Sequence, residues 1–482
     1  MTVFSATLSG VEPIPIEIEI DISSGLPFFQ IVGLPDEILR ESKTRVKSAI
    51  IQAGFDFPYD QRVVLNLAPS EIKKEGSSFE LGLAARILAQ TGQITLPNFD
   101  TLFLGELALD GAIRSVPEMG ALAFAAEKMG ALVISESGLA QLPQVPCPVV
   151  AIKKIQDLKE PEWWRKFLFN PESSRELNQE LSRATSGDES FSAGDFERLQ
   201  FSSFWAKHLE IAAVGGHHYL ICGPPGCGKT FFAESLRALL DLLPYEPGRE
   251  VKILNALFRR PDQGRPWSAP HHSATAKGLV GGGSPPRPGA VTKAHGGILF
   301  LDELLEFPAA VLDSLREPLE KGVIEIHRAG GQMTFPSRFQ LIAATNPCRC
   351  GFWGHPLKSC MCRPDRRVLY QARLSGPFFD RLDVRLVVSP QLESGPTVSG
   401  AKILKNVRLA VKFRRDHFPD WDEGAQKYLI ESQGQSMVSR RLTNKTATVA
   451  ETLACLDGSL LVDVSHVREA QNIRAFDLTQ RP

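Results

Sequence analysis

The stretch Gly223-Pro-Pro-Gly-Cys-Gly-Lys-Thr230 decides the fold of the larger part of this 482-residue chain. It fits the phosphate-loop pattern G-x-x-x-x-G-K-[ST], and it lies between an apolar strand pattern at 217–222 and a helix pattern. Lys229 is expected to reach the β- and γ-phosphates of a nucleotide, and Thr230 to offer a hydroxyl to Mg²⁺. The predicted nucleotide-binding residues of this loop are Gly223, Pro224, Pro225, Gly226, Cys227, Gly228, Lys229 and Thr230.

Two later strand patterns end in polar residues that suit the same site. Ile298-Leu-Phe-Leu-Asp-Glu303 is an apolar strand ending in two acids, as a Walker B element does. We expect Asp302 to hold Mg²⁺ and Glu303 to act as the general base that polarises the attacking water. The apolar strand at 339–345 ends in Asn346, which is placed to orient that water. These residues predict ATP hydrolysis rather than nucleotide binding alone.

The pattern on either side of the phosphate loop predicts several domains. Residues 1–158 alternate short strands, such as IEIEIDI at 16–22, with amphipathic helices at 36–52 and 79–88, which is typical of an α+β domain. Residues 159–200 are polar and Ser/Glu-rich, as in a linker. Residues 201–392 are expected to form the α/β core with its parallel sheet, and residues 400–482 a helical lid.

Composition and charge limit the cellular compartment and the partners that we expect for this protein. Hydrophobic residues make up 43% and charged residues 23%, as in ordinary globular proteins. No signal-peptide pattern and no long apolar run is present, and the eight cysteines do not resemble a disulfide framework, so we expect a cytoplasmic protein without membrane contact. Residues 201–482 carry 36 Lys and Arg against 27 Asp and Glu, whereas residues 1–160 carry 13 against 20. The basic half favours phosphate-bearing partners, although solvated basic faces and nucleotide-binding residues explain the surplus equally well.

Several stretches of the basic half resemble the Mg-chelatase-type branch of AAA+ ATPases. They are APHHSATAKGLVGGGS (269–284), HGGILFLDELLEF (295–307), FPSRFQLIAATNPC (335–348) and GPFFDRLD (376–383). The resemblance implies that Asn346 is sensor 1, that Arg381 is an arginine finger acting on the neighbouring subunit's nucleotide, and that Arg441 is the sensor-2 arginine, with Arg440 as its alternative. Each arginine is alternatively a surface ion-pair residue. A finger supplied in trans implies a ring, and the family implies a homohexamer.

The N-terminal half is similar to the ComM/YifB family, through DISSGLPFFQIVGLPDEILRESKTRVKSAI (21–50), VVLNLAPSEIKKEGSSFELGLA (63–84) and LFLGELALDGAIRSVPEMG (102–120). This resemblance implies a Lon-protease-like domain of the ribosomal S5 domain 2 type. Ser78 stands where the Lon nucleophile would be, but the stretch 117–121 lacks the lysine that must act as its base. Lys128 lies further along and is expected to face solvent. A role in assembly or nucleic-acid contact is therefore favoured over peptidase activity.

Four cysteines follow Asn346 closely: Cys348, Cys350, Cys360 and Cys362. Two close pairs separated by a short loop can surround one tetrahedral Zn²⁺, so structural zinc is expected in the loop 348–362. His355 is a possible substitute for one thiolate, and four reduced surface thiols are the alternative. Because the cluster follows sensor 1 directly, a metal loop here is expected to report nucleotide state to DNA.

Three weaker features complete the pattern. His271 and His272 are expected to point to opposite sides of an extended segment and to make phosphate or subunit contacts rather than bind metal. Residues 322–336 predict a hairpin with Arg328 near its tip, either pore-facing or purely structural. Cys227, in a variable position of the phosphate loop, introduces a possible redox sensitivity.

The resemblance implies an Mg²⁺-dependent ATPase that moves on single-stranded or branched DNA and promotes branch migration in homologous recombination during natural transformation, alongside other recombination proteins. Two alternatives belong to other classes: a chelatase motor for metal insertion, and a protein-remodelling or Lon-like motor. The four-cysteine loop and the N-terminal domain argue against the first, and the missing lysine argues against a protease.

Overall fold

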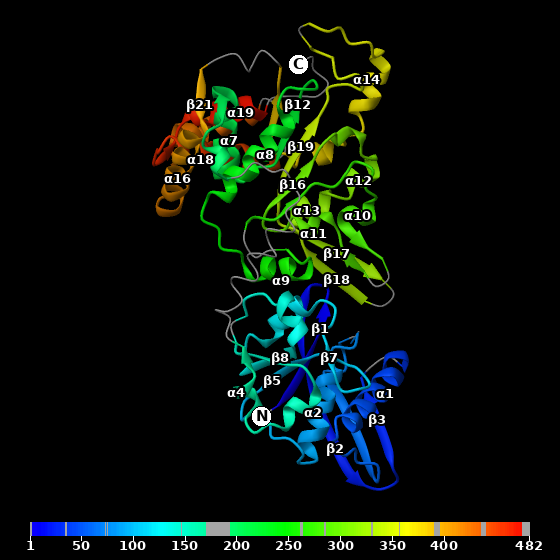
Figure 1. The fold of residues 1–482 in the computed structure, drawn as a ribbon. Helices are drawn as coiled ribbons and strands as arrows, with labels where there is room; N and C mark the ends of the chain where they lie inside the picture. Colours follow the sequence, from blue (N-terminus) through cyan, green and yellow to red (C-terminus); the bar gives the residue numbers. More distant parts are fainter. Residues whose placement is uncertain are drawn as a thin grey trace. The chain divides into compact units, whose positions relative to one another are not determined.

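The computed structural model divides the chain into two compact units (Figure 1). The first comprises residues 1–187 and 248–263, and the second comprises residues 188–247 and 264–482. The residues described are 2–33, 36–72, 74, 76–145, 147–169, 193–260, 264–283, 286–328, 331–355, 357–389, 396–434 and 440–474. Among the helices of this described part, none is long and apolar enough to cross a lipid bilayer.

In the first unit, eight described strands form one mixed sheet in the order β10-β9-β8-β5-β1-β2-β4-β3. These are β1 (Val3–Ser9), β2 (Glu12–Ser24), β3 (Phe28–Val32), β4 (Gln61–Ala68), β5 (Thr101–Leu104), β8 (Ala131–Ser135), β9 (Val149–Ile152) and β10 (Leu168–Phe169). The alternation in β2 works as predicted, because Ile16 and Ile18 are buried while Glu19 faces out. Strands β5 and β8 are buried along their whole length, so both faces of this part of the sheet are covered.

Helices and short turns cover that sheet. They are α1 (Asp36–Gln52), α2 (Glu80–Gln90), α3 (Met119–Leu122), η1 (Ala123–Ala126), η2 (Glu136–Gln141), η3 (Ile155–Lys159) and α4 (Trp163–Lys166), with a small hairpin of β6 (Glu106–Leu107) and β7 (Ile113–Arg114). Helix α2 is buried along most of its length, and Ile87 and Leu88 join the same core as Leu65 and Phe103.

The start of the expected linker, residues 159–169, is folded into the first unit. Trp163 is 1% exposed, packs against Phe103 with 6.1 Å between ring centroids, and donates its indole N–H to the carbonyl of Thr95 at 2.9 Å. The polar residues around Trp163 gave this segment a linker composition, whereas one large aromatic side chain anchors it. Of the rest of the expected linker, residues 170–192 lie outside the described residues. Residues 193–200 contain α6 (Ala193–Phe196) and the start of β11 (Gln200–Ser202), and Phe196 is buried in the core of the second unit.

Helix α9 (Arg249–Leu257) follows the phosphate-loop helix in sequence but packs in the first unit. Its Arg249 makes ion pairs of 2.8 Å with both Glu12 and Glu127, and Ile253 is buried against Phe124. The expected core 201–392 is therefore interrupted in space by residues 248–263. Sequence periodicity could not reveal this, because an amphipathic helix does not specify which sheet it covers.

In the second unit, described strands form a five-stranded parallel sheet in the order β13-β16-β19-β12-β20. These are β12 (Tyr219–Cys222), β13 (Trp267–Ser268), β16 (Ile298–Leu301), β19 (Gln340–Thr345) and β20 (Val384–Val387). Every residue of β12, β16 and β19 is buried, as expected for strands covered on both faces. The predicted α/β core with a parallel sheet is confirmed.

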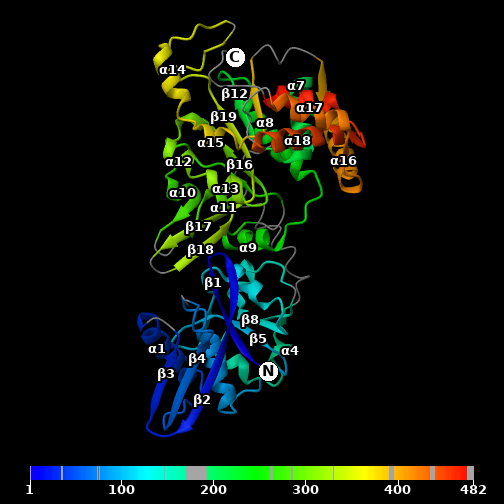
Figure 2. The same ribbon diagram turned by 180° about the vertical axis from the view of Figure 1, so that it is seen from behind.

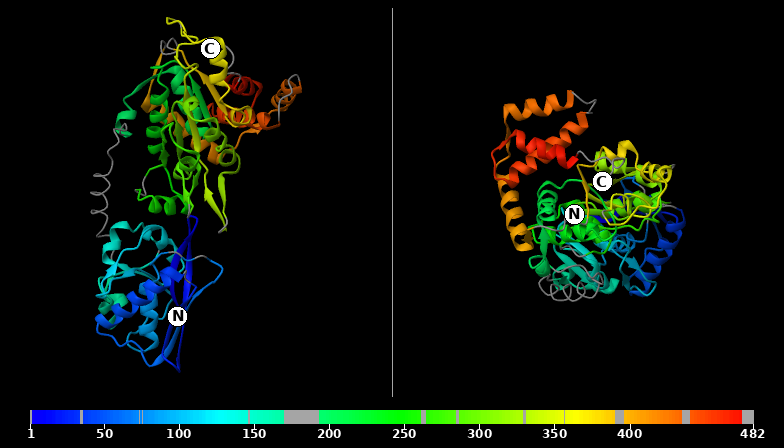
Figure 3. Two further views of the ribbon diagram at one scale, coloured as in Figure 1. Left: turned by 90° about the vertical axis from the view of Figure 1, so that its right-hand side faces the viewer. Right: turned by 90° about the horizontal axis from the view of Figure 1, so that it is seen from above.

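The lid residues form α16 (Gly400–Asp416), α17 (Glu423–Gly434), α18 (Arg440–Leu456) and α19 (Val464–Arg474). Figure 2 shows α16, α17 and α18 gathered beside α7 (Ser203–Gly215), and Figure 3 shows the orange and red lid helices to one side of the core. Val407, Ala450 and Ala470 belong to the same buried cluster as Ile221 of the sheet, so lid and sheet share one core.

The remaining described elements of the second unit connect these parts. They are α6 (Ala193–Phe196), β11 (Gln200–Ser202), α8 (Lys229–Asp241), α10 (Ala276–Val280), β14 (Gly281–Gly282), β15 (Arg287–Pro288), α11 (Ala290–Lys293), η5 (Leu304–Glu306), α12 (Ala309–Asp313), α13 (Arg316–Lys321), β17 (Val323–Arg328), β18 (Gly331–Pro336), α14 (Pro364–Gln371), α15 (Gly376–Phe379), β21 (Thr397–Ser399), β22 (Asp420–Trp421) and β23 (Leu461–Val462). Strands β17 and β18 pair antiparallel, which confirms the predicted hairpin. The side chain of Arg328 lies outside the described residues.

Replacing Trp163 tests whether 159–169 is part of the first unit. Trp163→Ala should lower the free energy of unfolding of that unit by about 3–5 kcal/mol, because it removes a fully buried aromatic side chain. Hydrogen–deuterium exchange of β5 and β9 in the full chain measures this. Leu26→Ala, at a side chain that is 89% exposed, should change it by less than about 0.5 kcal/mol. Equal exchange in both variants would contradict the assignment.

Candidate nucleotide site

The phosphate loop is shaped by glycines at the end of β12. Gly226 and Gly228 have φ angles of 82° and 81°, in the left-handed region that favours glycine. A Cβ at Gly223 would lie 2.7 Å from both Cys227 Sγ and the carbonyl oxygen of Val388, so a side chain has no room there. The loop therefore turns tightly into the N-terminus of α8, where backbone N–H groups can face an anion.

Lys229 is buried at the first position of α8. Its Nζ donates to the carbonyls of Gly223 at 2.8 Å and Pro224 at 2.9 Å, and to Asn346 Oδ1 at 3.1 Å. These three acceptors are neutral, so the ammonium is fixed in place while its charge is left for an anion. The contact with Asn346 also brings together two residues that the sequence predicted separately.

The two residues expected to hold Mg²⁺ lie side by side. Thr230 donates its hydroxyl to Asp302 Oδ2 at 3.1 Å, and Asp302 Oδ1 accepts the N–H of Glu303 at 2.8 Å. A hydroxyl and a carboxylate are the oxygen ligands that Mg²⁺ takes beside nucleotide phosphates. The donor set fits Mg²⁺, which would supply charge neutralisation at the phosphates.

Glu303 has a φ angle of 51°, which is uncommon for a residue other than glycine. The few non-glycine residues with such angles are concentrated at functional sites. Its Oε2 lies 3.0 Å from Nδ1 of His272, whose ring lies 4.0 Å from the ring of His271. The expectation that the two histidines point to opposite sides is wrong. The N–H of Ala274 donates to the carbonyl of His271 at 2.9 Å, so the segment is a turn and the rings lie together.

Register explains why these residues converge. In the parallel ladders Leu301 pairs with Ala343, and Cys222 pairs with Thr345, so β16, β19 and β12 end at one edge of the sheet. The residues that follow are Asp302, Asn346 and the phosphate loop. Ligands of open α/β sheets bind at this carboxyl edge.

Arg381 does not contact the phosphate loop of its own chain. Its guanidinium pairs with Glu320 of α13 and donates to the carbonyls of Arg316 and Pro377, and its side chain is only 14% exposed. Within one chain, Arg381 is thus an ion-pair residue. The backbone of Arg440 and Arg441 begins α18, but both side chains lie outside the described residues.

A buried carboxylate beside Arg381, which sequence analysis missed, joins the lid to the sheet. Asp383 accepts the N–H of His218 at 2.7 Å and pairs with Lys445 of α18, and its carbonyl accepts from Arg474 of α19 at 2.6 Å. Lys445 also donates to the carbonyl of Arg381 at 2.6 Å. Burial by itself would raise the pKa of Asp383, but His218 and Lys445 hold it below its ordinary value. Nothing in the sequence signals a pair of residues 62 positions apart.

The four cysteines come together as their spacing predicted. Their sulfur atoms all lie within 4.8 Å of one another, with Cys348 Sγ 3.4 Å from Cys350 and 3.6 Å from Cys360. A tetrahedral zinc site with Zn–S bonds of about 2.3 Å has S···S edges of about 3.8 Å, which is close to these separations.

The surroundings of the cluster also suit a metal. Burial would raise the pKa of Cys350, but backbone N–H groups of Phe352 and Met361 lower it to about 6, whereas burial raises the pKa of Cys348 and of Cys362. One of the four sulfur atoms is therefore already disposed to be a thiolate. His355 Nδ1 accepts the N–H groups of Leu357 and Lys358 at 3.0 Å. That histidine closes the loop instead of replacing a cysteine.

Ser78, the position of a Lon-type nucleophile, is a buried structural residue. Its hydroxyl donates to the carbonyl of Ala6 at 3.0 Å. The nearby Lys74 donates to the carbonyls of Pro69 and Ile72, and Lys128 is exposed. Among the described residues, these contacts give the Ser78 hydroxyl no activating base.

Comparisons with known proteins agree with this geometry. Residues 195–395 match the family model "Magnesium chelatase, subunit ChlI", and residues 18–137 match "Subunit ChlI of Mg-chelatase". The chain is 36% identical to the uncharacterized protein YifB of Escherichia coli, with 97% of this chain and 96% of that protein covered. It is 37% identical to the competence protein ComM of Haemophilus influenzae over 82% of this chain and 77% of that protein. Lon protease 2 of Bacillus subtilis is 30% identical over 178 residues, which cover 32% of this chain and 31% of that protein.

Two substitutions separate nucleotide binding from hydrolysis at this site. Lys229→Ala should abolish binding of a fluorescent ATP analogue, because it removes the charge that faces the phosphates. Glu303→Gln should retain binding but lower kcat for ATP hydrolysis by about 10²–10⁴-fold, the range expected for loss of a general base. Near-normal hydrolysis by Glu303→Gln would show that another group activates the water.

Proposed function

Starting from the premise that this chain belongs to the ComM/YifB family of Mg-chelatase-like proteins, we propose that it is a Mg²⁺-dependent AAA+ ATPase that converts ATP hydrolysis into movement on DNA. The observation that carries the ATPase is the meeting of Lys229, Asn346, Thr230, Asp302 and Glu303 at one edge of the parallel sheet.

Each of these side chains has a separate role in hydrolysis. The phosphate loop and Lys229 bind the phosphates, while Thr230 and Asp302 hold the cation that neutralises them. Asn346, fixed against Lys229, orients a water molecule at the γ-phosphate. Glu303 accepts a proton from that water, and His272 sets the direction of its carboxylate.

DNA is the proposed polymer for two reasons. The chain is similar to a protein named for competence, and the second half of the sequence has a surplus of nine positive charges. A basic surplus favours a polyanion. In this proposal the motor acts as a helicase that promotes branch migration on single-stranded or branched DNA during homologous recombination in natural transformation.

Ring assembly follows from the same proposal. In a homohexamer, Arg381 would leave Glu320 and reach the nucleotide of the neighbouring subunit, and Arg441 would act as sensor 2 within its own subunit. The contacts of Lys445 with Asp383 and the Arg381 carbonyl give lid movement a direct route to the finger. The first unit is proposed to be the Lon-like, S5 domain 2-type part, serving assembly rather than peptide cleavage.

Structural zinc is the proposed occupant of the four-cysteine cluster. Four sulfur atoms with near-tetrahedral spacing match the ligand set of closed zinc sites. The cluster would cross-link the loop that follows sensor 1.

Steady-state ATP hydrolysis by the purified full-length protein tests the motor. We compare no polymer, single-stranded DNA, branched DNA and unfolded polypeptide, with Glu303→Gln as the inactive control. DNA should raise turnover several-fold, and the rise should shrink with added salt, because counterion release drives binding. Stimulation by polypeptide with indifference to DNA would instead place the protein among remodelling motors.

Metal analysis tests the zinc proposal. The protein purified without added metal should contain about one zinc per chain, and Cys360→Ser should reduce that content. Cys147→Ser is the matched control, because Cys147 lies in the first unit outside the cluster and should leave zinc unchanged. Zinc-free wild-type protein whose four thiols all react with a thiol reagent would contradict the proposal.

A further inference from the structure

The four-cysteine loop continues into a strongly basic segment. Residues 348–373 contain the basic side chains Arg349, Lys358, Arg363, Arg366, Arg367 and Arg373 against one acid, Asp365. A zinc ion with four thiolates would contribute −2, and the segment would still be positive. These residues supply more than half of the positive surplus of the basic half of the chain.

Most of this charge is exposed and uncompensated. Arg349, Lys358, Arg363 and Arg366 are exposed, and within the described part of the chain no carboxylate lies within ion-pairing distance of them. Unpaired guanidinium groups clustered on one segment are the usual electrostatic footprint of a phosphate backbone.

Apolar and aromatic side chains are interspersed with the charges. Leu357 is 89% and Met361 91% exposed. Arg367 lies 5.2 Å from the ring centroid of Trp353, and Lys358 lies 5.0 Å from that of Phe352. Such a mixture suits a nucleic-acid strand, which offers both phosphates and base faces.

The same segment touches each element of the nucleotide site. Gly351 approaches the phosphate loop so closely that a Cβ there would lie 2.6 Å from Pro225 Cδ. Gln371 of α14 donates to the carbonyl of Pro347, next to Asn346, at 3.1 Å. Arg373 donates to the carbonyl of Leu305, two residues beyond Glu303, at 2.6 Å. In Figure 1 the loop and α14, in yellow, project beyond the ends of β12 and β19.

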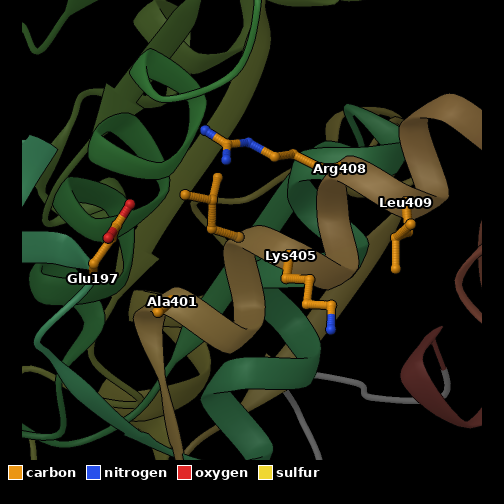
Figure 4. Close-up of a pocket in the computed structure, with 6 residues that line it drawn as sticks. Glu197, Ala401, Lys405, Arg408 and Leu409 are labelled. Atoms are coloured by element: carbon orange, nitrogen blue, oxygen red, sulfur yellow. The ribbon is translucent and has the colours of Figure 1, made fainter.

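A second basic surface lies on α16 of the lid, around a hollow shown in Figure 4. Lys405 and Arg408 lie at this hollow, but so does the carboxylate-bearing Glu197, and Arg408 also donates to the carbonyl of Leu242 at 3.2 Å. Its charges are thus partly engaged within the chain.

From these contacts we propose that the four-cysteine loop and α14, residues 348–355 and 357–373, form the surface that binds the sugar–phosphate backbone of DNA. This inference rests on the proposed DNA motor and adds the place of contact. Because the surface abuts Pro225, Pro347 and Leu305, DNA bound there shifts the phosphate loop, sensor 1 and the Walker B end together. It thereby links DNA binding to ATP turnover.

Fluorescence anisotropy with a labelled single-stranded oligonucleotide tests this surface. Wild-type protein is compared with the double variants Arg363→Ala/Arg366→Ala and, as matched control on α16, Lys402→Ala/Lys405→Ala. Titrations run with Mg²⁺ and a non-hydrolysable ATP analogue, between roughly 50 and 200 mM salt. Thermal melting confirms that each variant is folded; all four side chains are exposed, so melting should be unchanged.

The Arg363→Ala/Arg366→Ala protein should bind more weakly, and its slope of log affinity against log salt should be smaller by about 1.4–1.8, the value for two lost phosphate contacts. It should also lose stimulation of ATP hydrolysis by DNA while retaining basal turnover. The α16 variant should match the wild type. Unchanged affinity and slope in the loop variant, or a loss confined to the α16 variant, would overturn this proposal. Failure of the wild type itself to bind DNA would instead overturn the proposed motor.

Discussion

The structure depends on three buried parallel strands, β12, β16 and β19, that end at one edge of a sheet. Every residue of these three strands is buried. A shift of one strand along its neighbour would leave backbone N–H and C=O groups unpaired in the core, so the register of the strands is fixed. The polar residues that follow each strand therefore meet without any further specification. Lys229 and Asn346, separated by 117 positions, form a hydrogen bond for this reason.

Two other sets of contacts connect this sheet to the rest of the second unit. At the carboxyl edge, the four-cysteine loop lies against the phosphate loop through Gly351 and Pro225. At the opposite end of the sheet, before β12 and β20, Asp383 ties the lid to the strands through Lys445 and the N–H of His218. The sheet is thus joined to an exposed basic surface at one end and to the lid and the Arg381 backbone at the other.

The buried carboxylate of Asp383 contributes more to the position of α18 than to net stability. Removing the charge of Lys445 would leave the buried carboxylate of Asp383 without its ion-pair partner, which typically costs about 3–5 kcal/mol. The pair adds little net stability by itself, since both groups lose water. Its value lies in fixing one orientation of α18 beside Arg381.

The sequence by itself determined the parallel α/β core, the nucleotide-site residues and the meeting of four cysteines, because apolar runs, glycine spacing and short loops act locally. Tertiary structure alone decided that α9 and Trp163 belong to the first unit, that His272 turns toward Glu303, and that Asp383 pairs with Lys445. Most of these contacts join residues that are distant in sequence. The histidine side chains instead lie together because the backbone forms a turn that the sequence pattern did not indicate. Hydrophobic pattern specifies that a face is buried but does not specify its partner.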